Sequence, residues 1–180
     1  PDSAVWHVHG CIATLVGGIR ALLMQAAHPA ALTGVAEHSA YDSDPLGRLE
    51  RTTRWLTITS FGSTEAIEIE ASRVNKMHQR VSGEFRKKSG EVAQYSAQDP
   101  RYLLWVHCAF TDSFLRVHQE LKYTLPHGAD QYVKEWAKSA IPLGLTEAPL
   151  SQNELERTMK SFADNEVAGI EMTPPIVTFI

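Results

Sequence analysis

The sequence predicts an all-α protein, folded as a single multi-helix bundle of about seven to eight helices. Apolar residues recur mainly at helical spacing, and the alternation that is typical of strands is almost absent. A proline follows a helix-capping aspartate at two places, Asp44-Pro45 and Asp99-Pro100. We expect residues 1–180 to form one domain, and the abrupt end at Phe179-Ile180 suggests a piece of a longer protein that lacks its C-terminal part.

In the first half of the chain we expect five helices, over residues 4–12, 19–27, 29–37, 45–60 and 65–82. Gly17-Gly18 is expected to loosen the chain between the first two, because glycine disfavours helix interiors. Pro29 should break the second helix at His28, since a proline removes a backbone donor and restricts the residue before it. Ser63 or Thr64 can cap the fifth helix, which should end at Gly83.

The second half of the chain begins with a polar segment from Glu84 to Gln98, which shows no apolar period and is expected to be an exposed loop. Three further helices are predicted, over residues 101–123, 130–140 and 151–163. The last of them starts at a capping box, in which Ser151 precedes Glu154 by three residues. The tail with Pro174-Pro175 cannot be assigned.

The composition excludes several classes of protein. A net charge of −4 argues against nucleic acid as a partner. The most apolar stretch, residues 11–35, is interrupted by polar residues, so no transmembrane segment is expected. Cys11 and Cys108 show no zinc-binding spacing and fit a reducing compartment, and we therefore expect a cytoplasmic location.

Two of the eight histidines lie within apolar stripes at helical spacing. His78 is in register with Ile67, Ala71 and Val74, and His107 with Leu103, Phe110 and Phe114. A buried imidazole needs a hydrogen-bond partner for each nitrogen, or a metal. Each ring is therefore either a satisfied core histidine or a ligand to a bound group, and the residues alone leave both readings open.

The helix expected at 45–60 carries a polar row. Arg48, Thr52 and Trp55 fall on one face, and Arg51 lies beside Thr52. Such a row could bind the carboxylates of an anionic cofactor through bidentate guanidinium contacts. Alternatively, the three arginines of this helix form a solvent-facing stripe that pairs with Glu50. Common motifs of di-iron, zinc-protease, nucleotide-binding and α/β-hydrolase sites are absent from the sequence.

A set of short strings occurs in a characteristic order. They are QAAHP at 25–29, GVAEHS at 34–39, DPLGRL at 44–49, MHQRVSG at 77–83 and YSAQDP at 95–100. With these strings the chain resembles the catalytic domain of the MpaB and rubber-oxygenase (latex-clearing protein) family. The resemblance covers essentially the whole chain and is clearest over residues 1–118.

The resemblance implies an oxidoreductase. Members include rubber oxygenases, which are α-helical haem b proteins that cleave a carbon–carbon double bond with O₂, and fungal oxygenases acting on prenyl side chains. It implies haem b as cofactor, with O₂ and an apolar, isoprenoid-like small molecule as substrates. His78 matches the proximal ligand of the haem iron, and Arg48 and Thr52 match polar residues beside the haem.

Two departures from the family pattern concern catalysis. Arg51 falls where some members place a lysine that closes the distal side of the iron, and a guanidinium is a poor iron ligand because it stays protonated. The stretch over residues 30–33 has no carboxylate, although rubber oxygenases carry their catalytic base there. Arg51 and His28 are therefore catalytic candidates only by position, and His107 is included as a cofactor-binding candidate.

Two other functions fit the same sequence. One is a haem-binding protein without oxygenase turnover, such as a sensor or carrier. The other is a haem-free helical protein that acts through partner interaction, in which His78 and His107 are ordinary core residues. The oligomeric state is left open, with a homodimer among the arrangements considered.

Overall fold

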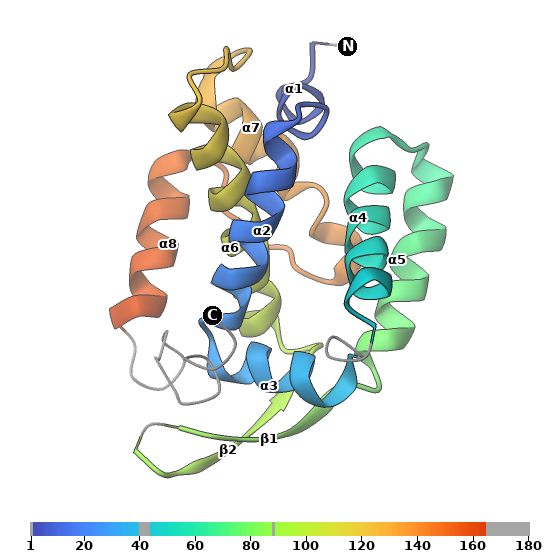
Figure 1. Cartoon of the computed structure of the whole chain (residues 1–180), viewed down its shortest axis with the longest axis vertical. Helices are drawn as coiled ribbons and strands as arrows, with labels where there is room; N and C mark the ends of the chain where they lie inside the picture. Colours follow the sequence, from blue (N-terminus) through green and yellow to red (C-terminus); the bar gives the residue numbers. More distant parts are fainter. Residues whose placement is uncertain (1, 40–43, 88, 165–180) are drawn as a thin grey trace.

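The computed structural model describes residues 2–39, 44–87 and 89–164, which are mostly helical (Figure 1). Within them lie eight α-helices: α1 (Ala4–His9), α2 (Ala13–Ala26), α3 (Pro29–His38), α4 (Pro45–Phe61), α5 (Thr64–His78), α6 (Pro100–Glu120), α7 (Gly128–Ala137) and α8 (Gln152–Asp164). A short 3₁₀ turn, η1 (Ile141–Leu143), and a two-stranded sheet accompany them. The prediction of a largely helical fold is confirmed, and the sheet is an addition to it.

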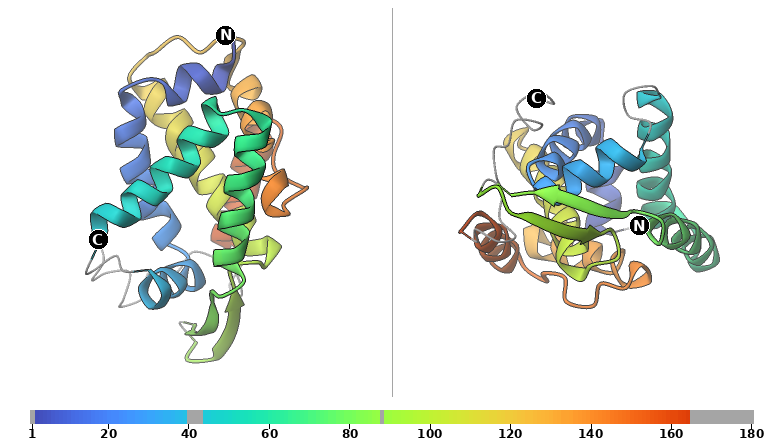
Figure 2. Two further views of the ribbon diagram at one scale, coloured as in Figure 1. Left: turned by 90° about the vertical axis from the view of Figure 1, so that its right-hand side faces the viewer. Right: turned by 90° about the horizontal axis from the view of Figure 1, so that it is seen from below.

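The sheet overturns the prediction of an exposed loop between Glu84 and Gln98. Strands β1 (Ser82–Arg86) and β2 (Val92–Ser96) pair antiparallel and extend below α3 (Figures 1 and 2). Each strand buries a single large side chain, Phe85 and Tyr95, which pack against α3 and the start of α6. One apolar anchor per strand is too weak a period to be recognised in an otherwise polar segment.

Helices α2 and α6 pack on each other more extensively than any other pair of elements among the described residues. Ala13, Gly17 and Ala21 recur every fourth residue on the face of α2 that is buried, and they are small enough for the two backbones to approach closely. A Cβ built at Gly17 would lie 2.7 Å from Cδ1 and 3.2 Å from Cα of Phe114 on α6. Gly17 is therefore a packing requirement.

This packing corrects the prediction that Gly17-Gly18 interrupts the chain. Helix α2 runs through both glycines, and the break comes earlier, between the end of α1 and residue 13. There the amide of Gly10 donates to the carbonyl of Trp6, and the Thr14 hydroxyl donates to the carbonyl of Val8. The intrinsic cost of glycine in a helix is outweighed here by the contact that it permits.

The helix starts predicted at Pro29, Pro45 and Pro100 are confirmed. The Asp44 and Asp99 carboxylates accept backbone hydrogen bonds at the starts of α4 and α6, from Gly47 at 2.9 Å and from Arg101 at 2.9 Å. His28 caps α3 as Pro29 begins it, with its Nδ1 accepting from the Ala30 amide at 3.2 Å. Helix α5, in contrast, ends at His78 and not near Gly83, because the chain turns there into β1.

Replacing Gly17 by alanine should destabilise the protein, because the new methyl group overlaps the Phe114 ring and backbone. We expect the free energy of unfolding to fall by about 1–3 kcal/mol, as is usual when a packed core is overfilled. Gly18→Ala is the matched control, since a Cβ there meets no atom within 4 Å and the change should stabilise the helix by up to about 1 kcal/mol. Urea denaturation of both variants measures the difference, and equal effects would mean that α2 and α6 are not in close contact.

Candidate functional site

Helices α4 and α5 lie side by side on one flank of the fold (Figures 1 and 2). A carboxylate joins them: Glu70 on α5 is only 1% exposed and accepts hydrogen bonds from Arg73 and, at 3.0 Å, from Nε of Arg54 on α4. The hydrogen bond from Arg73 is the main reason that the pKa of Glu70 is lowered. The pair is thus held by a buried ionised group rather than by apolar packing alone.

The inward side of α4 is only partly covered by protein. Of its described side chains, Ser60 alone is buried, while Arg48, Thr52 and Trp55 are half-buried. Apart from α5, the element that α4 contacts most is α1. A helix face of mixed polar and aromatic residues that remains partly open is a suitable wall for a small-molecule ligand.

Arg48 projects toward the ends of α2 and α3. Its Nη1 donates to Oγ of Ser39 at 2.8 Å, and its Nη2 lies 3.5 Å from Oε1 of Gln25. Both acceptors are neutral, and Arg48 has no acidic partner among the described residues. Burial, followed by the nearby charge of Arg51, lowers the pKa of the Arg48 guanidinium. Within the described residues no acidic group offsets this charge, which is of the kind that binds an anionic ligand.

The alternative of a solvent stripe pairing with Glu50 does not match the contacts of the described residues. Arg51, 41% exposed, lies 3.6 Å from the carboxylate of Asp44, and Arg54 bonds to Glu70. Thr52 turns its hydroxyl back to the carbonyl of Arg48 at 3.1 Å. Three of the sequence-predicted residues, Arg48, Arg51 and Thr52, therefore lie together on α4.

His78 and His107 lie on different helices, α5 and α6, and their rings do not contact each other in the described part of the chain. His78 is half-buried, and burial lowers the pKa of its ring. The same cause lowers the pKa of His107 to about 4. The Nε2 atom of His107 is inaccessible and has no hydrogen-bond partner among the described residues. No hydrogen bond of the His78 ring occurs within the same residues.

Most of the remaining histidines differ from His78 and His107 in the hydrogen bonds of their ring nitrogens. Five of them use a ring nitrogen in a hydrogen bond to a described residue: His7, His9, His28, His38 and His118. His127 makes no such bond but is exposed. Within the described chain, His78 and His107 are thus the two rings that burial shifts and that no hydrogen bond holds.

His118 and His28 are both buried, and each ring makes a hydrogen bond within the protein. His118, near the end of α6, is only 3% exposed, and its Nε2 lies 3.3 Å from the carbonyl of Thr124. His28 is 1% exposed and packs edge-on against Tyr102 and near Trp105. It lies beneath α6 at the start of α3, apart from the polar row of α4.

Gln25 and Ser39, to which the sequence analysis assigned no role, contact Arg48, and Gln25 also contacts α6. Gln25 accepts a hydrogen bond from Nε1 of Trp105 with its backbone carbonyl, at 3.2 Å, and approaches Arg48 with its side chain. Ser39 supplies the shorter of the Arg48 contacts. Both residues fall within the strings that carry the family resemblance, and that position was the only sequence signal for them.

The described residues hold no group of three or more histidine, cysteine or acidic side chains placed to bind a metal ion. A haem iron differs from such a chelate, because the porphyrin supplies four ligands and the protein as few as one. Cavities of about 340 and 440 Å³ flank α5, and neither is lined by His78 or His107. None of the described helices is both long and apolar enough to cross a bilayer.

A comparison with models of known protein families shows which family the chain belongs to. The model of the ER-bound oxygenase mpaB/B′ and rubber oxygenase catalytic domain matches residues 6–179. The chain belongs to this family. Searches of curated proteins and of solved structures returned no match. The resemblance inferred from the ordered strings is thereby confirmed, and this mpaB/rubber-oxygenase domain is an oxygenase catalytic domain by family.

His107 should make this mpaB/rubber-oxygenase domain sensitive to acid. Its pKa is about 4 in the folded state and about 6.5 when unfolded, so the unfolded chain binds more protons between these values and stability falls as pH drops from 6.5 to 4. His107→Leu should flatten this dependence by up to about 1.4 kcal/mol per pH unit. His9, with a pKa of about 3, retains its own share of the slope.

At pH 7, without added ligand, His107→Leu should also raise the free energy of unfolding by about 1 kcal/mol or more, because it removes a buried nitrogen that lacks a partner. Urea denaturation at several pH values measures both effects. A leucine variant that is less stable at pH 7 and keeps the full slope would mean that the imidazole is satisfied in the folded protein.

Proposed function

We propose that this domain is a haem b-dependent oxygenase that acts with O₂ on an apolar small molecule of isoprenoid character. The observation that carries the proposal is the ring of His78, which is half-buried at the end of α5 and makes no hydrogen bond to a described residue. Neutral imidazole is the form that ligates iron. Burial, which lowers the pKa of His78, favours that form at neutral pH.

The polar row of α4 fits the other end of a haem. Propionates are carboxylates, and Arg48 is a half-buried guanidinium whose present acceptors are neutral. Arg48 would hold a propionate, with Thr52 one turn further along the same helix. Trp55 on α4 and Phe110 on α6 are half-buried aromatic rings that could contact the apolar porphyrin.

A bound haem would supply the iron that activates O₂, and the protein would supply its environment. In this proposal His78 would be the residue that holds the iron. Arg51 would act as a cation or hydrogen-bond donor rather than as a ligand, because a guanidinium is a poor iron ligand. Nε2 of His107 has no hydrogen-bond partner among the described residues but is inaccessible, so it would meet a bound molecule only if neighbouring side chains moved.

A second candidate function is haem binding without oxygenase turnover. It is favoured by the stretch over residues 30–33, where rubber oxygenases carry their catalytic base. Here Leu32 is 3% exposed and packs against Ala26, so no carboxylate occupies that position. The nearby Glu37 is already engaged, since its carboxylate accepts a hydrogen bond from the Tyr95 hydroxyl at 2.7 Å. Consumption of O₂ with an isoprenoid substrate separates the two candidates.

Removing the proposed axial ligand should remove the colour of the protein. We expect His78→Ala to lose most of its haem, as judged by the Soret absorbance of purified protein and by titration with hemin. His7→Ala is the control, because that ring is exposed and bonds only to the Ser3 carbonyl. In His78→Gly, added imidazole should restore the Soret band by entering the vacated space. Equal haem loss in His78→Ala and His7→Ala, or wild-type protein that hemin cannot reconstitute, would reject the assignment.

Arg48→Ala should weaken haem retention while the fold persists, since the side chain is peripheral to the core. Loss of a charged hydrogen bond to a propionate predicts roughly tenfold faster haem release. Transfer of haem to an acceptor protein gives the rate, and far-UV circular dichroism checks the fold. Arg51→Ala, which removes a more exposed guanidinium on the same helix, should release haem more slowly than Arg48→Ala. Global unfolding of Arg48→Ala would instead make Arg48 a structural residue.

A further inference from the structure

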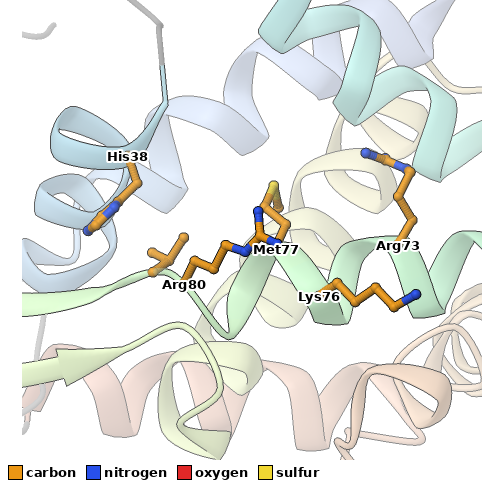
Figure 3. A pocket seen from close by; sticks show the side chains of 6 residues that line it. His38, Arg73, Lys76, Met77 and Arg80 are labelled. Atoms are coloured by element: carbon orange, nitrogen blue, oxygen red, sulfur yellow. The ribbon is translucent and has the colours of Figure 1, made fainter.

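The cavity of about 340 Å³ lies between the end of α3 and the last turn of α5 (Figure 3). It is separate from the polar row of α4 and is not lined by His78. Its lining combines basic and apolar side chains: His38, Arg73, Lys76, Met77, Arg80 and Val81. In Figure 3, Met77 and Arg80 lie between His38 on α3 and Arg73 on α5.

The basic side chains of this cavity exceed the acidic groups around them. Arg80 and Lys76 have no acidic partner among the described residues. Arg73 bonds to Glu70, which also binds Arg54, and Arg73 feels the charge of Glu50 as well, but neither acid is among the residues that line the cavity. The cavity therefore carries an excess of positive charge.

The acid nearest to His38 does not neutralise this excess. The Glu37 carboxylate lies 4.0 Å from Nε2 of His38, and it accepts the hydroxyl hydrogen of Tyr95 at 2.7 Å. Nε2 of His38 also lies 3.2 Å from the Ser82 carbonyl. Glu37 is thus turned toward β2 and is absent from the lining of the cavity.

The apolar part of the lining comes from the last turn of α5 and the residues that follow it. Met77 is 45% exposed although it is a large apolar side chain, and Val81 is half-buried. Methionine is flexible and polarisable, so it adapts readily to an alkyl group. Arginine and lysine beside such a surface suit a ligand with an anionic head and an apolar chain.

We propose that this cavity binds the acidic head group, a phosphate or a carboxylate, of a small molecule with an apolar chain. Arg80 provides the main charged contact, because it combines a position in the lining with the lack of an acidic partner. The apolar chain lies against Met77. This assignment goes beyond the oxygenase proposal and does not require haem.

Calorimetric titration of the full chain with octyl phosphate, below its critical micelle concentration, tests the proposal. Octyl phosphate should bind more tightly than inorganic phosphate, and added salt should weaken it. Octanoate reveals whether a carboxylate is accepted in place of a phosphate, and tight binding of either amphiphile supports the assignment. Arg80→Gln should weaken octyl phosphate binding about tenfold, the usual effect of losing one charged hydrogen bond.

Arg157→Gln is the matched control, since Arg157 is likewise exposed and without an acidic partner among the described residues but lies on α8. It should leave the affinity within about twofold. Met77→Ser should weaken octyl phosphate and leave inorganic phosphate unchanged. The proposal is overturned by equal losses in the two arginine variants, by octyltrimethylammonium binding as tightly as octyl phosphate, by inorganic phosphate binding as tightly, or by no binding. Because hemin is absent from these titrations, their failure leaves the haem proposal to its own test.

Discussion

The close contact of α2 with α6 is the constraint on which the rest of the structure depends. It requires a glycine beneath Phe114, and it fixes where the C-terminal end of α2 lies along α6. At that end the Gln25 carbonyl accepts the indole hydrogen of Trp105, and the Gln25 side chain approaches Arg48. The packing of α2 on α6 therefore fixes where Gln25 meets Arg48, while α4 itself packs mainly on α1 and α5.

The α4–α5 flank is joined in a different way. A buried carboxylate with two arginines is an expensive connection compared with apolar packing, because three charged groups lose part of their hydration. It has a geometric consequence, however. Since Glu70 ties α4 to α5, the inward side of α4 need not pack tightly on α6. Arg48, Thr52 and Trp55 can then remain half-buried, as the wall of a ligand site requires.

Sequence reasoning succeeded where the deciding interaction is local and failed where it is not. The Asp-Pro starts of α4 and α6 could be predicted because a cap and its amide lie within three residues of each other. Helix α2 was wrongly divided because the reason for Gly17 is a ring about one hundred residues away. For the same reason the neutral acceptors of Arg48 could not be identified, whereas the apolar stripes correctly marked His78 and His107 as shielded side chains.

The energetics of these two imidazoles connect stability with the proposed function. An unpaired buried nitrogen costs about 1–3 kcal/mol, a large part of the net stability of a domain of this size. The rings of His9, His28 and His118 each have at least one hydroxyl, amide or carbonyl partner, although Nδ1 of His118 and Nε1 of Trp136 also lack a partner among the described residues. Within the described residues, neither the ring of His78 nor that of His107 makes a hydrogen bond, and Arg48 has no acidic partner. In the proposed function, one bound group would interact with both kinds of residue, with the imidazole of His78 through its iron and with Arg48 through a carboxylate.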